Sequence, residues 1–334
     1  MARILVIGGS RFMGLRLVWH LLAQGHAVTI LNRGRSDDPF GPRVARLRAD
    51  RSTPALRAAL SGHSFDAAVD FAIFGGGDAK GAIEALAGRV GHYVFISSGQ
   101  VYLVRESVAR DAPLGEDTYE GPVMQPPEDP HDLAEWRYGV GKREAEDIFA
   151  SAFTTMGFPC TALRLPMVEG ERDPSGRLEG YLWRILDGGP VLLPDGGAQT
   201  VRHVYSGDVA RTVGAMLGMT GTFGQAYNLC QEEMPTLREL VELLSDLAGA
   251  PDRLQAIGSG TLRAAGIRPE AISPFSTPWM SLLDPGKAQR DLGFRHTELR
   301  NYLGSIVAAW YARSAWRPPE SYGLRAKELA LLGA

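Results

Sequence analysis

Short apolar runs alternate with amphipathic stretches along the first half of the chain. The apolar runs are rich in Val, Ile and Leu, whereas the stretches between them carry apolar residues at every third or fourth position, as helices do. Apolar strands separated by helices indicate a parallel sheet that is covered on both faces. The pattern therefore predicts an α/β fold with a doubly wound parallel sheet. The expected strands are Arg3–Ile7, Val28–Leu31, Val44–Leu47, Ala67–Phe71, Tyr93–Ser97 and Thr161–Leu165.

The regular alternation stops after Leu165, where proline and glycine residues separate shorter elements. This change predicts a smaller C-terminal subdomain that follows the sheet domain. The expected boundaries are 1–165 for the sheet domain with 201–229 returning to it, 166–200 and 230–312 for the subdomain, and 313–334 for a C-terminal tail.

Two further segments stand out from this pattern. Residues 105–135 are rich in Pro, Asp and Glu and have no clear period, so we expect a surface excursion of the kind that often covers a site. Thr236 is followed three residues later by Glu239 and by an apolar stripe, and this spacing predicts a capped helix N-terminus.

The composition narrows the classes of partner. Of the 334 residues, 45% are apolar, and 35 Lys+Arg against 38 Asp+Glu give a net charge of −3. Such a composition is typical of a globular chain, and the lack of a basic block argues against nucleic acid or an anionic membrane surface as the main partner. We therefore expect small-molecule partners.

Cysteine and histidine usage bears on metals and on the compartment. Cys160 and Cys230 are too few for a disulfide framework, and the seven histidines are dispersed, so we expect no metal site. The sequence shows neither a leader pattern nor an apolar run of about 18 residues, which favours a cytoplasmic protein with no membrane span.

A glycine-rich turn follows the first expected strand directly and leads into an amphipathic helix. Glycine permits a positive φ or a close backbone approach, and the N-terminus of the helix supplies amide donors to an anion. A strand, a tight turn and a helix at the start of such a pattern predict dinucleotide binding, with a purely structural turn as the alternative. The expected contact residues in the turn are Gly8, Ser10, Arg11, Phe12, Met13 and Gly14.

The end of the second expected strand bears on the choice of cofactor. It reads Asn32-Arg33, with Arg35 close by, and lacks the acidic residue that binds a ribose 2′-hydroxyl in NAD-specific folds. Arginine suits a 2′-phosphate, and Arg11 could add a second guanidinium. NADP(H) is therefore favoured. NAD(H) stays open, because arginines that merely face solvent in a loop would give the same sequence pattern. The candidates for the adenine and ribose side are Asp50, Arg51, Phe71 and Ala72.

The candidate catalytic residues lie near the middle of the chain. Tyr138 and Lys142 are one helical turn apart, so both project from the same face of a helix. A positive Lys142 would lower the pKa of the Tyr138 phenol and let it exchange a proton with a substrate oxygen. Ser98 ends an apolar strand, where it could donate a hydrogen bond to the same oxygen. The alternative interpretation is a solvent-facing Tyr/Lys pair.

Together, these motifs resemble the extended short-chain dehydrogenase/reductases, often called the NAD-dependent epimerase/dehydratase family. The resemblance covers roughly residues 3 to 312. It implies a Rossmann domain, a nicotinamide cofactor, a Ser98/Tyr138/Lys142 triad, a C-terminal subdomain that selects the substrate, and a homodimer formed through helices of the first domain. Besides the motifs above, it rests on Leu163–Pro166, Arg202–Ala210, Tyr227–Leu229 and Asp284–Ala288.

The same resemblance implies further contacts and two departures. Gly99-Gln100 stands where sugar 4,6-dehydratases have Asp-Glu, so dehydration is not expected, and Met167 stands where nucleotide-sugar enzymes have Asn. Arg202 matches a phosphate-binding arginine, whereas His203 is either a substrate contact or a structural strand residue. The implied cofactor contacts are Ser97, Tyr138, Lys142, Leu165, Pro166 and Val168, and the implied substrate contacts are Ser98, Gln100, Met167, Arg202 and His203.

The resulting expectation is an NAD(P)-dependent oxidoreductase that transfers hydride at a carbinol or ketone carbon of a sugar-nucleotide-like or other small carbonyl substrate. A nucleotide-sugar 4-epimerase that retains NAD is the first alternative. The second is of another class, a non-catalytic dinucleotide-binding or RNA-associated protein, because the turn Gly8–Phe12 resembles that of atypical family members, which include chloroplast stem-loop-binding proteins.

Overall fold

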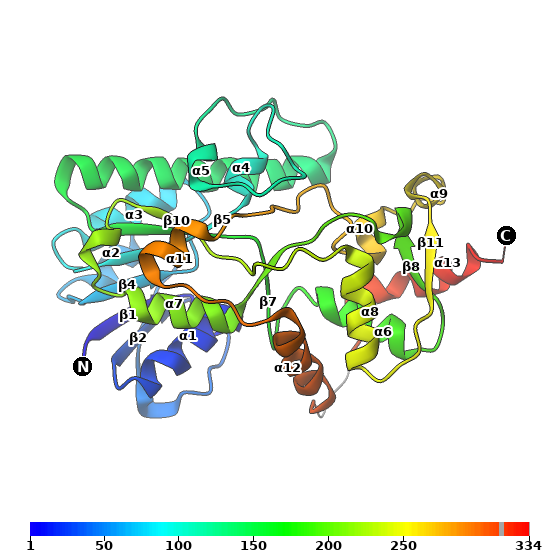
Figure 1. Ribbon diagram of the computed structural model, residues 1–334. Coiled ribbons are helices and arrows are strands. Elements are labelled where there is room, and N and C mark those ends of the chain that lie inside the picture. Colours follow the sequence, from blue (N-terminus) through cyan, green and yellow to red (C-terminus); the bar gives the residue numbers. More distant parts are fainter. Residues whose placement is uncertain (314–316, 334) are drawn as a thin grey trace. The chain divides into compact units, whose positions relative to one another are not determined.

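The computed structural model describes residues 1–313 and 317–333 (Figure 1), and its main feature is a seven-stranded sheet. The strand order is β10-β6-β5-β4-β1-β2-β3, and every neighbouring pair in it is parallel. This arrangement confirms the predicted doubly wound α/β fold. The strands of the sheet are β1 (Arg3–Ile7), β2 (Ala27–Asn32), β3 (Val44–Arg48), β4 (Ala67–Asp70), β5 (Tyr93–Ser98), β6 (Cys160–Leu165) and β10 (Ala226–Asn228).

Helices cover both faces of the sheet, because alternate residues of each strand point to opposite sides. In β1, Ile4 and Val6 join the core with α1 (Phe12–Ala23) and α7 (Ser206–Met216). Leu5 and Ile7 join the core on the other face with α2 (Ala55–Leu60), α3 (Gly76–Leu86) and α5 (Pro130–Met156). Residues on both faces are apolar, which explains why the strands have no polar alternation in the sequence.

The long helix α5 begins within the segment expected to be an excursion. Asp129 is its N-cap, and its carboxylate accepts hydrogen bonds from the main-chain N–H groups of His131 (2.9 Å) and Asp132 (3.0 Å). Pro130 takes the first helical position, which suits proline. The irregular segment therefore ends at Asp129 rather than at Glu135, and it follows the short helix α4 (Gln100–Leu103).

The contacts divide the chain into two compact units. Unit 1 comprises residues 1–168, 204–230 and 281–296, and unit 2 comprises 169–203, 231–280 and the described residues from 297 onward. The expected boundaries differ from these units mainly at 281–296, which the sequence pattern assigns to the subdomain, and by three residues each at 166–168, which lie in unit 1, and 201–203, which lie in unit 2. Segment 281–296 contains α11 (Gly286–Leu292) and packs in unit 1, where Lys287 donates to the main-chain oxygen of Ala226 (2.9 Å).

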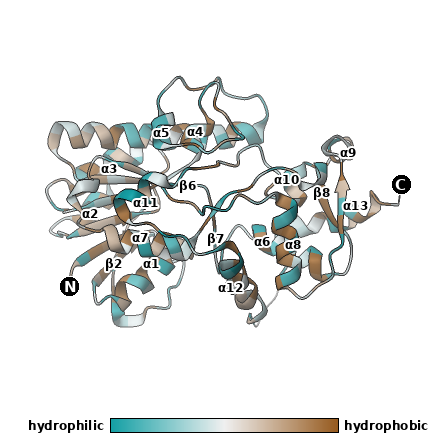
Figure 2. Ribbon diagram, in the orientation of Figure 1, coloured by the Kyte–Doolittle hydropathy of each residue, from teal (hydrophilic) through white to brown (hydrophobic). Residues whose placement is uncertain are grey.

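Unit 2 contains a small parallel sheet and several short helices. The predicted capping box is confirmed at α8 (Leu237–Leu247), where the side chains of Thr236 and Glu239 each accept from the other's main-chain N–H. Figure 2 shows both hydrophobic and hydrophilic residues on α8, as expected for a helix with one buried face. The other elements are α6 (Arg177–Leu186), β8 (Val191–Pro194), β11 (Leu254–Ile257), α9 (Ser259–Ala264), α10 (Pro269–Ile272), α12 (Leu299–Tyr311) and α13 (Arg325–Ala330).

The described C-terminal residues include a helix that packs in unit 2. The expected tail, 313–334, includes residues 314–316 and 334, which lie outside the described part. Within the described part, α13 belongs to unit 2, and its buried Glu328 accepts from Arg184 Nε (2.9 Å) and Arg325 Nη1 (3.1 Å). Two more short strands, β7 (Met167–Glu169) and β9 (His203–Tyr205), pair with each other.

Candidate active site

The glycine turn between β1 and α1 is too tight for side chains. Gly8 has a φ of +88°, which favours glycine, and a Cβ on Gly14 would lie 2.2 Å from the main-chain oxygen of Gly8. Arg11 is the N-cap of α1 and, in the described part of the chain, provides no side-chain cap, so the first N–H groups of the helix are not satisfied by it. These features fit a bound pyrophosphate.

Exposed arginines follow the carboxyl ends of β1 and β2. Arg33 and Arg35 are both exposed and close enough to Asp50 to lower the pKa of its carboxyl, although hydrogen bonds from Ser52 lower it more. Arg11, in the glycine turn, is exposed as well. The structure thus places three guanidinium groups at the end of the sheet where a 2′-phosphate was expected.

Four other expected cofactor contacts lie at or just after the ends of neighbouring strands. They are Asn32, Arg51, Phe71 and Ala72. Asn32 Nδ2 donates to Ser10 Oγ (3.4 Å), which joins the end of β2 to the turn. The main-chain N–H of Phe71 donates to the oxygen of Ile7 (3.1 Å). Arg51 is less available, because its guanidinium donates to Asp70 Oδ2 (2.7 Å) and to the main-chain oxygen of Asp78 (3.1 Å). The next residue after Phe71, Ala72, donates its N–H to Asp70 Oδ1 (2.8 Å).

Ser98, Tyr138 and Lys142 are brought together at the carboxyl end of β5. Ser98 is the last residue of β5, and a hydrogen bond joins its side chain to the Tyr138 hydroxyl. The Nζ atom of Lys142 lies 5.5 Å from the centre of the Tyr138 ring. It donates to the main-chain oxygens of Ile73 (2.6 Å) and Ile96 (2.8 Å), and burial lowers the pKa of Lys142 to about 8. The ammonium is therefore held in place and still mostly charged at neutral pH.

The pKa of Tyr138 is shifted in the direction opposite to our expectation. The sequence suggested that Lys142 would lower it, but burial raises it, the hydrogen bond with Ser98 lowers it in part, and Glu135 raises it further. A raised pKa keeps the phenol protonated at neutral pH. Tyr138 is thus poised to donate a proton rather than to accept one.

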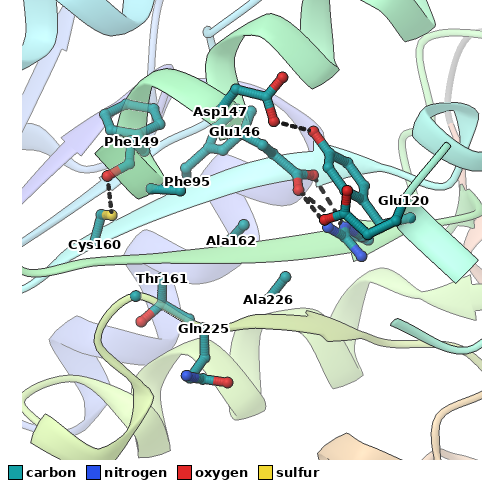
Figure 3. Close-up of a pocket in the computed structure, with 14 residues that line it drawn as sticks. Phe95, Glu120, Glu146, Asp147, Phe149, Cys160, Thr161, Ala162, Gln225 and Ala226 are labelled. Atoms are coloured by element: carbon teal, nitrogen blue, oxygen red, sulfur yellow. Dashed lines mark hydrogen bonds and ion pairs between the residues drawn. The ribbon is translucent and has the colours of Figure 1, made fainter. Parts of the chain in front are cut away.

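Ser97 faces a different group from Ser98, because neighbouring strand residues point to opposite sides of the sheet. Its hydroxyl donates to Glu146 on α5, and Glu146 forms a buried ion pair with Arg164 (2.6 Å). Figure 3 shows Glu146 in the wall of a cavity of about 210 Å³, which Arg164 lines as well, together with other residues of α5, β6 and β10. The expected contact between Ser97 and a cofactor therefore stays a prediction, with the hydroxyl already engaged.

Gln100 lies beside Ser98 and is paired with a residue that the sequence did not suggest. Its Nε2 donates to Glu135 Oε2 at 2.6 Å. The one available signal was that Glu135 lies one helical turn before Tyr138. A Cβ on Gly99 would lie 2.2 Å from Ser281 Oγ, so the aspartate that dehydratases have at this position has no room here.

The segment after β6 runs beside these residues. The main-chain N–H of Gly99 donates to the oxygen of Leu165 (2.7 Å), which brings the two strand ends together. Leu165, Pro166 and Val168 are buried, and Met167 is half-buried. Their proposed contacts to cofactor and substrate would have to come from main-chain groups and apolar surface.

Two expected substrate contacts lie in unit 2 and are engaged or enclosed there. Arg202 donates from Nε to the main-chain oxygen of Gln231 (2.8 Å) and from Nη2 to that of Glu232 (3.0 Å). His203 is buried against the Phe275 ring, at 4.4 Å between ring centres, and burial lowers its pKa to about 3. Both side chains thus have a structural role, whatever else they contact.

A buried carboxyl group of unit 2 lies at the end of the short strand β7. Glu169 is fully buried, and burial raises its pKa to about 8 although Arg177 Nε donates to its Oε1 (3.2 Å). Among the described residues, its Oε2 has no hydrogen-bond partner. The neutral acid is therefore the form that the fold favours near pH 7.

We expect the Glu169→Gln variant to gain stability relative to the wild type as the pH rises. A carboxyl whose pKa is raised from 4.5 to about 8 on folding binds its proton more tightly in the folded state, so wild-type stability falls between these pH values. The neutral amide removes this loss, which approaches roughly 5 kcal/mol above pH 8. Chemical denaturation between pH 5 and pH 9 measures the difference.

The control for this prediction is Glu242→Gln, which removes an exposed carboxylate that lies 3.6 Å from Arg238. An exposed pair contributes little, so its difference from the wild type should stay nearly constant over the same range. A pH-independent difference for Glu169→Gln would show instead that Glu169 is charged in the folded protein.

Metal-binding clusters and membrane-spanning helices would each change the class of site. Residues 1–313 and 317–333 include no group of three or more His, Cys, Asp or Glu side chains arranged to hold a metal ion. In the same residues, no helix combines the length and apolar character needed to cross a bilayer.

The doubly wound sheet and the glycine turn after β1 are those of a dinucleotide-binding fold. A sequence model of the NAD dependent epimerase/dehydratase family matches residues 4–230, and the chain belongs to that family. It also resembles, by fold, dTDP-glucose 4,6-dehydratase from Bacillus anthracis, solved in complex with NAD (TM-score 0.73, 16% identity, 96% of this chain and 99% of the other). UDP-glucose 4-epimerase from Thermotoga maritima, solved with UDP-glucose, is similar too (TM-score 0.69, 19% identity, 92% and 98%).

Two curated relatives match three quarters of the chain. The chloroplast stem-loop binding protein of 41 kDa b from Arabidopsis thaliana is 25% identical over 264 residues, which are 75% of this chain and 64% of that protein. The 2′-dehydrokanamycin reductase of Streptomyces kanamyceticus is 26% identical over 254 residues, which are 75% of this chain and 67% of that protein. The chain thus spans about two thirds of the length of each.

Proposed function

We propose that this protein is an NAD(P)H-dependent reductase of a ketone or aldehyde. The observation that carries the proposal is the Tyr138 hydroxyl, protonated at neutral pH and hydrogen-bonded to Ser98, beside the fixed ammonium of Lys142. Tyr138 donates the proton that a carbonyl oxygen takes up as hydride arrives at carbon, and Ser98 holds that oxygen. A bound nicotinamide would supply the hydride. The relative named 2′-dehydrokanamycin reductase supports this direction of reaction.

We further propose NADP(H) as the preferred cofactor. Solved neighbours hold NAD, so the preference rests on this chain's own residues. Arg11, Arg33 and Arg35 are exposed at the ends of the first strands, and no acidic residue occupies the end of β2. A 2′-phosphate would lie among these guanidinium groups, with Gly8–Gly14 around the pyrophosphate.

Replacing Arg33 and Arg35 together with alanine is expected to weaken NADPH binding by about tenfold or more, or about 1.4 kcal/mol. NADH affinity should change by less than about twofold, because NADH has no 2′-phosphate for these residues to contact. Calorimetric titration of both cofactors measures the change. Arg57→Ala, an exposed arginine on α2, is the control. Equal losses for both cofactors would assign the arginines a structural role instead.

A nucleotide-sugar 4-epimerase that retains NAD is the second candidate, supported by the fold similarity to UDP-glucose 4-epimerase. An epimerase keeps its hydride in a bound cofactor, so NAD should survive purification. Mass spectrometry of the small molecules released on denaturation therefore tests the proposal directly. Retained NAD would replace the reductase with an epimerase, whereas cofactor-free protein that oxidises NADPH with added ketones would support the reductase.

Other proposals for this chain follow from the family. A homodimer and a cytoplasmic location stay predictions, and light scattering tests the first. Dehydration is not proposed, because Gln100 has an amide in place of a titratable acid and Gly99 has no room for one. An RNA-associated role, which the name of the Arabidopsis relative brings up, would leave the Ser98, Tyr138 and Lys142 arrangement without a use.

A further inference from the structure

One end of the Gln100 side chain is held, and the other end is without a partner. The main-chain N–H of Gln100 donates to Ser98 Oγ (3.2 Å), and its Nε2 donates to Glu135 Oε2 (2.6 Å). The residue is only 9% exposed. Among the residues described, its Oε1 meets no hydrogen-bond donor. A buried acceptor is therefore left on the residue that bonds to Ser98 through its main chain.

The pairing with Glu135 fixes which end of the amide is left. An ionised carboxylate only accepts hydrogen bonds, so the NH₂ group of Gln100 must face it and the carbonyl oxygen must turn away. The main chain of Gln100 packs closely against α5, because a Cβ on Gly139 would lie 2.8 Å from its carbonyl oxygen. The acceptor is thus oriented by Glu135 and supported by the α4–α5 contact.

A buried acceptor without a donor costs about 1–3 kcal/mol, and native proteins rarely keep one. A ligand that supplies a hydrogen-bond donor to this oxygen would remove the cost. Ser98 and Tyr138 hold the reacting oxygen in the proposed function, and Gln100 bonds to Ser98 through its main chain. A donor that reaches its side chain would then belong to an atom close to the reacting carbon.

We propose that Gln100 selects carbonyl substrates with a hydroxyl or amino group on the carbon next to the one that receives hydride, and that Glu135 is the positioning residue that presents the Gln100 oxygen to that group. This inference rests on the proposed function. The substrates are then α-hydroxy or α-amino ketones, as keto forms of sugars and amino sugars are. A ketone without the donor leaves the acceptor unpaired and is reduced less efficiently.

The test compares 2-hydroxycyclohexanone with cyclohexanone as probes. Both have the same ring, and only the first carries a donor beside the carbonyl. Cofactor oxidation is followed with whichever of NADPH and NADH binds more tightly, and the readout is the ratio of the two kcat/KM values. In the wild type we expect a preference of about tenfold or more for the hydroxyketone.

Three variants separate the roles of the two residues. Gln100→Leu keeps much of the volume and lacks the acceptor, so the ratio should fall to within about twofold of one. Glu135→Leu frees the amide to rotate and should lower the ratio by about fivefold, mainly through a higher KM for the hydroxyketone. Glu135→Gln, whose amide still accepts but can also donate, should give an intermediate ratio. Gln255→Leu, an exposed glutamine on β11, is the control and should not change it.

The outcomes distinguish this inference from the function on which it rests. A wild type that reduces both ketones with equal efficiency overturns the inference and leaves the reductase intact. So do Glu135 variants that slow both ketones alike, because a merely structural role would leave the ratio unchanged. A wild type that binds NADPH but reduces neither ketone overturns both. A ratio that falls in Gln100→Leu and in Glu135→Leu supports the inference.

Discussion

Replacing Tyr138 with phenylalanine is expected to lower kcat for ketone reduction by about a thousandfold, since a general acid contributes about 10²–10⁴. Phenylalanine keeps the ring, which lies 5.5 Å from Lys142 Nζ, and removes the hydroxyl that bonds to Ser98. Cofactor affinity should therefore stay within about threefold of the wild type. Calorimetry measures the affinity, and single-turnover oxidation of bound NADPH at saturating 2-hydroxycyclohexanone measures the chemical step.

Tyr119→Phe is the matched control for this loss. Burial raises the pKa of Tyr119 as well, but its hydroxyl donates to Asp147 Oδ1 (2.7 Å) and not to Ser98. Loss of that bond should change kcat by less than about twofold. If Tyr138→Phe kept more than about a tenth of the wild-type kcat, another group would have to donate the proton, and the assignment of Tyr138 would be wrong.

The parts of the site that the sequence predicted are set by local patterns. Gly8 has a positive φ, and a Cβ on Gly14 would collide with Gly8 itself, so the need for both glycines arises within the turn. Tyr138 and Lys142 share a helix face whatever the helix packs against. Ser98 ends an apolar strand, and the carboxyl ends of parallel strands meet at one edge of a sheet. The expected strand β1 agrees with the structure at both ends.

The parts that the sequence did not predict depend on which charged groups meet in three dimensions. Gln100 and Glu135 are separated by the whole irregular segment, and no periodicity connects them. Lys142 was expected to act on Tyr138, but its ammonium is bonded to two main-chain oxygens. Main-chain acceptors are the same at every residue, so the sequence offers no signal for such contacts. Segment 281–296 packs in unit 1, and no pattern in the sequence indicates that it does so.

The buried ion pair of Glu146 and Arg164 is another such contact, and it connects α5 to the sheet. Arg164 donates to Glu146 from Nε (3.0 Å) and from Nη2 (2.6 Å), and it donates from Nη1 to the Tyr102 hydroxyl (2.7 Å). The two charged side chains are only 5% and 6% exposed. Glu146 lies one helical turn after Lys142 and accepts from Ser97, the neighbour of Ser98. The pair thus holds α5 and β5 in the register that the catalytic residues need.

Arg164→Met is expected to lower the free energy of unfolding by about 3–5 kcal/mol, because it leaves the Glu146 carboxylate buried without its counter-charge. The double variant Glu146→Leu/Arg164→Met should recover to within about 2 kcal/mol of the wild type, since apolar side chains of similar size often replace a buried pair at little cost. Chemical denaturation of the wild type, both single variants and the double variant gives the coupling energy.

Arg300→Met provides the comparison that isolates burial. Arg300 and Asp246 also approach to 2.6 Å, but each side chain is 62% exposed. Water solvates the charge that remains, so the loss should be below about 1 kcal/mol. Equal losses for Arg164→Met and Arg300→Met would mean that burial does not decide the strength of the Glu146 contact. A double variant no more stable than Arg164→Met would mean that the unpaired Glu146 carboxylate is not what destabilises the single variant.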